Sequence, residues 1–193
     1  YDISMPNQKT GIVPNKKWKK EKMGESWYAG ETLISAIGQG FVLTNPFQLA
    51  VMTSIIASNG KNIEPTIIKG NRVSFKTNDK YSKEIKIIKK AMFKVVNENK
   101  GTAFKSRLED IKFAGKTGTS QVRRISLSER ESDDFREKEQ EWKNRDHALF
   151  VGYMPYDDPT YSISVIIEHG GSGASTAAPI AKQIFNYINE LEV

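Results

Sequence analysis

The stretch FAGKTGTSQV, residues 113 to 122, decides how the rest of the chain is interpreted. Its Gly115-Lys116-Thr117 matches the end of a phosphate-binding loop, whereas Lys116-Thr117-Gly118-Thr119 suits a strand that recognises an extended ligand. A phosphate loop needs a glycine separated by four residues from its Gly-Lys pair, and a helix directly after it. The first position holds Asp110, a carboxylate where an anion would sit, and Gly118 to Val122 continue as a strand. The sequence therefore favours the strand.

The chemistry of this strand suits a peptide that ends in a carboxylate. Lys116 supplies a fixed positive charge, and Thr117 and Thr119 supply hydroxyl groups. Gly118 has no side chain to block the backbone of a ligand. Such a set fits an extended peptide laid beside an exposed strand edge. Taken alone, the same four residues also fit an ordinary surface strand, so the neighbouring segments have to decide.

Length and composition indicate one folded domain. The chain has 193 residues, of which 38% are hydrophobic and 27% charged, which is typical of a soluble globular protein. No run is long and apolar enough for a membrane span or a signal peptide. The chain begins at Tyr1 within a polar segment, so we expect it to be a piece of a longer chain, with any export signal or anchor upstream. The absence of cysteine excludes disulfides and cysteine zinc sites.

The net charge of +6 includes a dense basic cluster at Lys16–Lys22. Such a run can contact nucleic acid or an anionic membrane, but it is more often a solvated surface segment. No nucleic-acid motif accompanies it, so the sequence predicts a solvated segment and no nucleic-acid partner.

Hydrophobic patterning predicts an α+β fold, with helices, then an antiparallel meander, then a final helix. The first helix covers Phe47–Ala57, with Thr44 or Asn45 as its cap and Pro46 in its first turn. The second covers Ser82–Asn99, and the last begins at about Ser175. The predicted strands are Phe113–Val122, His147–Tyr153 and Tyr161–Glu168. Residues 1 to 40 show no clean period.

A charged excursion, residues 123 to 146, separates the first two predicted strands. It is too long for a hairpin turn, and we expect it to hold a short solvated helix.

The segments around the Lys116 strand resemble a known family. They are Trp27–Thr32, Ile37–Gly40, Thr44–Ala50, Gly101–Ala103, Phe113–Thr119 and His147–Tyr153. In this order they are similar to the class B penicillin-binding proteins, and particularly to those that act in cell elongation. The resemblance covers nearly the whole chain from about Asp2, and the charged excursion matches least.

This resemblance implies the penicillin-binding transpeptidase or serine β-lactamase-like fold, an antiparallel sheet with helices packed on it. The implied reaction is the D,D-transpeptidation of peptidoglycan stem peptides, in which β-lactams acylate the same serine. Lys116, Thr117, Gly118 and Thr119 would bind the ligand, with its carboxylate held by the lysine and the threonines. The Thr119 N–H would give one oxyanion-hole donor. No cofactor or metal is implied.

The resemblance also implies a setting. The stem peptides and β-lactams are the expected ligands, and a membrane glycosyltransferase of the elongation machinery is the expected protein partner. The expected location is the periplasmic face of the bacterial inner membrane.

The nucleophile of the family is expected to lie upstream of this chain. Ser58-Asn59-Gly60-Lys61 matches its Ser-x-x-Lys pattern in letters, but Ser58 is predicted to end a helix rather than begin one. Ser132-Asp133-Asp134 and Tyr187-Ile188-Asn189 match the second motif only by coincidence. Residues 1–193 are therefore interpreted as the C-terminal part of a single transpeptidase domain, inactive on its own. A penicillin-sensing receptor domain and an inert interaction domain of the same fold are the alternatives; Gln39-Gly40 and Pro46-Phe47-Gln48-Leu49 favour the transpeptidase.

The histidines and the glycines outside the strand have simpler interpretations. His147 and His169 are the only histidines and are predicted to occupy ordinary strand positions, since two histidines without a third ligand make a poor zinc site. Gly38 and Gly40 are predicted to allow close backbone packing. The loop Gly170-Gly171-Ser172-Gly173 is expected near the mouth of the site, with an open role.

Overall fold

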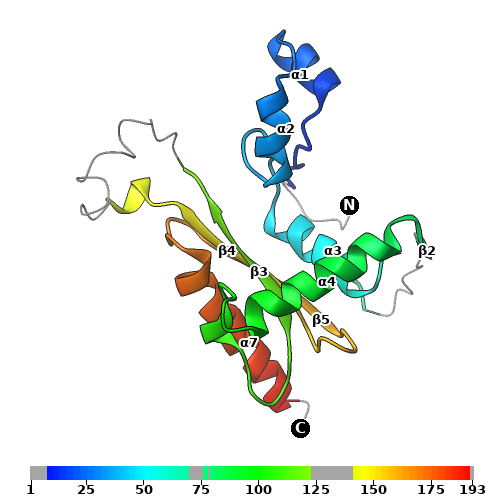
Figure 1. Ribbon diagram of the computed structural model, residues 1–193, viewed down its shortest axis with the longest axis vertical. Coiled ribbons are helices and arrows are strands. Elements are labelled where there is room, and N and C mark those ends of the chain that lie inside the picture. The colour runs from blue at the N-terminus through cyan, green and yellow to red at the C-terminus, as the bar shows by residue number, and fades with distance from the viewer. Residues whose placement is uncertain (1–7, 70–75, 78, 123–140, 192–193) are drawn as a thin grey trace.

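The computed structural model describes residues 8–69, 76–77, 79–122 and 141–191 (Figure 1). Its larger helices and strands are α1 (Lys16–Met23), α2 (Ala29–Ala36), α3 (Pro46–Ala57), α4 (Ser82–Asn97), β3 (Ala114–Ser120), β4 (His147–Met154), β5 (Tyr161–Ile167) and α7 (Ala178–Leu191). Its short elements are β1 (Lys61–Asn62), β2 (Lys76–Thr77), η1 (Asp79–Tyr81), η2 (Phe104–Ser106), η3 (Trp142–Asn144) and the π-helical turn η4 (Gly173–Ala177). None of the helices in the described ranges could span a membrane.

The sheet that carries the predicted site is antiparallel, with the strand order β3-β4-β5. Lys116 lies opposite Val151 on β4, and Leu149 of β4 lies opposite Ile166 on β5. All three predicted strands are present, and their ends differ from the prediction by no more than two residues. The predicted α+β class is therefore confirmed.

The side chains of β4 alternate between two hydrophobic clusters, one on each face of the sheet. Phe150 and Met154 are fully buried with Phe185 of α7 on one face of the sheet. Tyr153, on the other face, packs with Met92 of α4 and with Ala57 at the end of α3. Because successive strand residues point to opposite faces, β4 is buried on both sides, and helices cover both faces of the sheet (Figure 1).

The helix α3 begins and ends where local signals predict. The Asn45 side chain accepts a hydrogen bond from the Gln48 N–H at 2.8 Å, and the Gln48 side chain accepts one from the Asn45 N–H at 3.2 Å. This reciprocal pair is a capping box. Ser58 caps the other end, and Asn59 then takes a left-handed φ of 58°. The predicted helix is confirmed with Asn45 as its cap.

Residues 1 to 40 show no clean period in the sequence, yet α1 and α2 lie there and project from the rest of the molecule (Figure 1). Each helix has only eight residues, too few for a hydrophobic period to be visible. Tertiary contacts hold them instead. The ring centroids of Trp18 and Phe41 lie 5.4 Å apart, and Ile12 and Leu43 form an antiparallel β-bridge.

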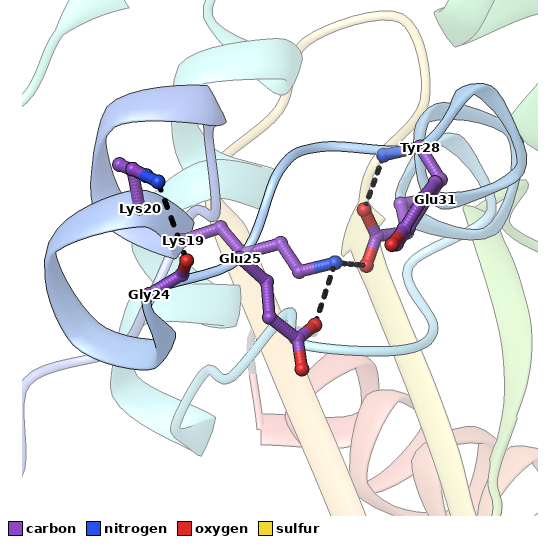
Figure 2. A network of polar contacts seen from close by, with 6 residues as sticks. All are labelled: Lys19, Lys20, Gly24, Glu25, Tyr28 and Glu31. Atoms are coloured by element: carbon purple, nitrogen blue, oxygen red, sulfur yellow. Dashed lines mark hydrogen bonds and ion pairs between the residues drawn. The ribbon is translucent and has the colours of Figure 1, made fainter.

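The basic cluster of α1 is only partly solvated, because Lys19 is 2% exposed. Its Nζ lies 2.5 Å from Oε1 of Glu31 on α2 and 3.3 Å from Oε2 of Glu25 (Figure 2). The Tyr28 ring lies 4.5 Å from the same Nζ, within range of a cation–π contact. Lys19 thus joins α1 to the start of α2, and the prediction of a wholly solvated segment is wrong at this residue.

The contacts among Lys19, Glu25 and Glu31 shift the pKa values of Lys19 and Glu31. Desolvation lowers the pKa of Lys19, but the hydrogen bonds and charges of Glu31 and Glu25 outweigh it, so the pKa lies above its usual value. The hydrogen bond from Lys19, with one from the Tyr28 N–H, holds the pKa of Glu31 below its usual value. Both residues are therefore held in their charged forms.

Candidate active site

The predicted ligand strand β3 presents an open edge. The Thr119 carbonyl accepts a hydrogen bond from Nε2 of Gln39 at 3.0 Å, and the Thr117 carbonyl accepts one from Nζ of Lys116 at 2.6 Å. Neither donor belongs to β4, so both carbonyls point away from it. The N–H and C=O groups of one strand residue point to the same side, so the N–H groups of Thr117 and Thr119 also lie on the open edge.

The four predicted ligand residues alternate between the two faces of the sheet. Lys116 and Gly118, opposite Val151 and Leu149 on β4, lie on one face. Thr117, opposite Phe150, lies on the other face. Lys116 is exposed. An extended ligand on the edge would therefore meet the lysine on one side and the threonine side chains on the other.

The segment after α4 also reaches β3. Thr102 follows the end of that helix, and its hydroxyl lies 2.8 Å from the hydroxyl of Thr117. The next residue, Ala103, is buried and donates its N–H to the Val95 carbonyl of α4. The Gly101–Ala103 motif thus ties the helix end to the predicted site, a contact that the sequence does not reveal.

The turn after α2 positions Gln39 beside the edge. Gly38 and Gly40 both take left-handed φ values, 75° and 73°, which glycine adopts at little cost. A Cβ on Gly38 would meet nothing within 4 Å, so the predicted close packing is wrong for this residue. A glycine on each side of one polar residue is the sequence signal that marks Gln39.

A pocket of about 410 Å³ opens between this turn and the sheet. Apolar side chains make up part of its wall, and Gln39, Thr119, His147 and Glu168 add polar groups. The pocket lies directly against the predicted ligand strand, so a bound peptide on the edge would border it.

The role of the glycine loop after β5 is visible at Gly173, where η4 begins. Gly173 is buried, and a Cβ there would clash with the carbonyl oxygens of Leu149 and Gly118. The missing side chain therefore lets η4 press against the middle of β3. This supports the backbone of the ligand strand from the face opposite Lys116.

The chance motif matches do not assemble a second site in the described residues. Ser58 ends α3 as predicted, and its hydroxyl donates to the Ile55 carbonyl at 3.3 Å. Tyr187 lies on α7 and is 61% exposed, so it does not pack in the core. The match at residues 132–134 lies outside the described residues. So does most of the charged excursion, in which a short helix is predicted. The described end of the excursion forms η3.

The two histidines contact each other. The His169 N–H donates to Nδ1 of His147 at 2.9 Å, and Nδ1 of His169 lies 3.0 Å from the Arg145 carbonyl. His147 begins β4, whereas His169 follows β5 with a φ of 55°, so the predicted strand position is wrong for His169. The described part of the chain holds no cluster of three metal-ligating side chains.

Comparison with known proteins identifies the family. The model of the penicillin binding protein transpeptidase domain matches residues 1–186. The chain is 33% identical to the peptidoglycan D,D-transpeptidase MrdA of Acinetobacter baumannii, covering 96% of this chain and 28% of that protein. It is 31% identical to MrdA of Haemophilus influenzae, covering 96% of this chain and 30% of the relative.

Solved structures agree with the sequence comparisons. The penicillin-binding protein PBP2 of Helicobacter pylori, in its complex with MreC, superposes with a TM-score of 0.81 at 34% identity, over 96% of this chain and 32% of that one. PBP2 of Pseudomonas aeruginosa, in complex with WCK 5153, gives a TM-score of 0.72 at 30% identity, over 95% of this chain and 38% of that one.

The chain thus spans between 28% and 38% of the length of these relatives. Within that span, the order of the motifs, the antiparallel sheet and the family model agree. The resemblance to class B penicillin-binding proteins is confirmed, and the chain belongs to the penicillin-binding protein transpeptidase family, with PBP2 among its relatives.

Proposed function

We propose that this chain is the C-terminal part of a peptidoglycan D,D-transpeptidase that binds penicillin. The observation that carries the proposal is the open edge of β3, where the outward N–H of Thr119 lies on the same strand as the exposed Lys116. An extended stem peptide can pair with such an edge through its backbone. Its terminal carboxylate would then be held by the charge of Lys116.

The chemistry requires a serine that this chain does not supply. The serine oxygen would attack the carbonyl of the penultimate D-alanine, forming an acyl-enzyme and releasing the terminal D-alanine, and the amine of a second stem peptide would then take the acyl group. The Thr119 N–H would stabilise the oxyanion of each step, and the loss of one such donor costs about 3 kcal/mol in a comparable site. The nucleophile would come from the upstream part of the same domain, so residues 1–193 alone would be inactive.

The cellular setting follows from the same proposal. A transpeptidase of this class acts on peptidoglycan at the periplasmic face of the inner membrane, with its anchor upstream of this segment. The PBP2 of Helicobacter pylori was solved with MreC. This supports a partner from the elongation machinery, and a membrane glycosyltransferase that supplies the glycan strands would be the functional partner.

The test compares two proteins, the full-length protein and the isolated chain, incubated with a fluorescent penicillin and then denatured. Covalent labelling is expected only in the full-length protein, because lactam opening requires an activated nucleophile held against a base. Transfer of a D-amino acid acceptor onto a stem-peptide donor would separate a transpeptidase from a receptor that only binds the drug. A labelled isolated chain whose signal vanishes in Ser58→Ala would overturn the proposal that the nucleophile is upstream.

A further inference from the structure

The contact between Gln39 and Thr119 joins two segments that lie 80 residues apart in the sequence. The backbone of Gln39 is held by the end of α2, because the Gln39 N–H donates a hydrogen bond to the Ile34 carbonyl at 3.1 Å. The preceding Gly38 N–H donates to the Ser35 carbonyl at 3.0 Å in the same turn. The end of α2 therefore presents the Gln39 amide to the strand edge in a defined position.

The Thr119 carbonyl can serve two donors at once. A carbonyl oxygen has two lone pairs, so the bond from Gln39 leaves one of them for an N–H of an extended ligand. Within the described residues no strand pairs with the open edge of β3, so backbone neighbours do not fix the edge on that side. The Gln39 amide supplies a fixed donor at the residue whose N–H faces the ligand.

We infer that Gln39 is a positioning residue, whose side-chain amide holds the Thr119 peptide group in the orientation that acylation requires. The inference rests on the proposed transpeptidase site and adds a residue to it. Gln39 acts through Thr119, so its loss should lower the rate of acylation more than the affinity for the unreacted drug. The required property is a hydrogen-bond donor at the end of the side chain.

The test uses the full-length protein with Gln39→Glu and Gln39→Met, and measures the acylation rate and the drug affinity separately with a fluorescent penicillin between pH 5 and 8. Both variants should acylate about fivefold more slowly at pH 8, since each lacks one neutral hydrogen bond. A protonated glutamate can donate again, so the rate of Gln39→Glu relative to the parent should rise as the pH falls toward the ordinary glutamate pKa of about 4.3. The relative rate of Gln39→Met should stay constant.

Gln183→Glu on the exposed face of α7 is the matched control and should acylate at the parental rate. A parent that is not labelled would overturn the proposed function itself. A labelled parent with both Gln39 variants at the parental rate, or with a constant relative rate for Gln39→Glu, would overturn only the role of Gln39. Thermal melts of all variants show whether a loss reflects unfolding, and a Gln39→Glu protein that melts with the parent and recovers at low pH supports the inference.

Discussion

The hydroxyl groups of Thr102 and Thr117 lie 2.8 Å apart, which connects the segment after α4 to the proposed ligand strand. Thr102→Val keeps the shape of the side chain but removes this hydrogen bond. We expect the free energy of unfolding to fall by about 1 kcal/mol and penicillin acylation of the full-length protein to slow modestly. Chemical denaturation and labelling kinetics measure the two effects. Thr10→Val, at an exposed residue distant from β3 in sequence, is the control; equal effects in both variants would contradict the prediction.

The charge of Lys116 is expected to serve ligand binding rather than folding. Its side chain is exposed, so Lys116→Ala should leave the melting temperature of the full-length protein nearly unchanged. Loss of a charge-assisted hydrogen bond of about 2 kcal/mol would slow penicillin acylation by about thirtyfold. Lys105→Ala changes an exposed lysine after α4 and should label normally. Undiminished labelling of Lys116→Ala would place the carboxylate site elsewhere.

The contact of Gly173 with the sheet predicts a strong effect of one methyl group. Gly173→Ala would force the new Cβ against the carbonyl oxygens of Leu149 and Gly118. We expect a loss of about 2 kcal/mol in the free energy of unfolding, together with slower acylation because β3 is displaced. Gly30→Ala, in the first turn of α2, is the matched control, since a Cβ there meets nothing within 4 Å. That variant should be neutral or slightly stabilising, and the opposite ranking in denaturant melts would refute the packing argument.

The Lys19 network predicts a limited pH range for the stability of the α1–α2 segment. The folded-state pKa of Glu31 is lowered, so its contribution is present above the unfolded pKa and is lost as the pH falls through the folded pKa. The folded-state pKa of Lys19 is raised, so its contribution is present below the unfolded pKa and is lost as the pH rises through the folded pKa. The segment should therefore loosen below about pH 4.3 and above about pH 10.4.

Tryptophan fluorescence can follow this change, because Trp18 and Trp27 lie in the same segment. Glu31→Gln should remove most of the acid-side dependence, whereas Glu21→Gln, at a surface pair with Lys17, should retain it. A parental signal that does not change between pH 7 and 3.5 would contradict the assigned role of Glu31.

The parts of the fold that local chemistry determines could be predicted from the sequence. The helix α3 has its cap at Asn45 and proline at Pro46, and the strands β3 to β5 show alternation or their motif directly. The helices α1 and α2 could not be predicted, because their stability depends on contacts such as Lys19 with Glu31, which no local pattern encodes.

Only part of the site could be predicted from the sequence. The Lys116–Thr119 motif could be recognised because its residues are adjacent in the sequence. The contact of Gln39 with Thr119 could not, because 80 residues separate the two and only the fold brings them together. The requirement for glycine at position 173 could not be predicted from the sequence, because it arises from the backbone of β3 and β4, which the fold brings against it.

The helix α2 has Glu31, bound to Lys19, near its first residue and the Gln39 turn just beyond its last. We expect a displacement at one end of this eight-residue helix to shift its other end. Under the proposed function, substitutions at Lys19 or Glu25, which contact no predicted ligand residue, should change how readily penicillin acylates the full-length protein. Under the proposed function, sequence surveillance for β-lactam resistance should therefore include α1, where a substitution leaves the predicted ligand residues unchanged.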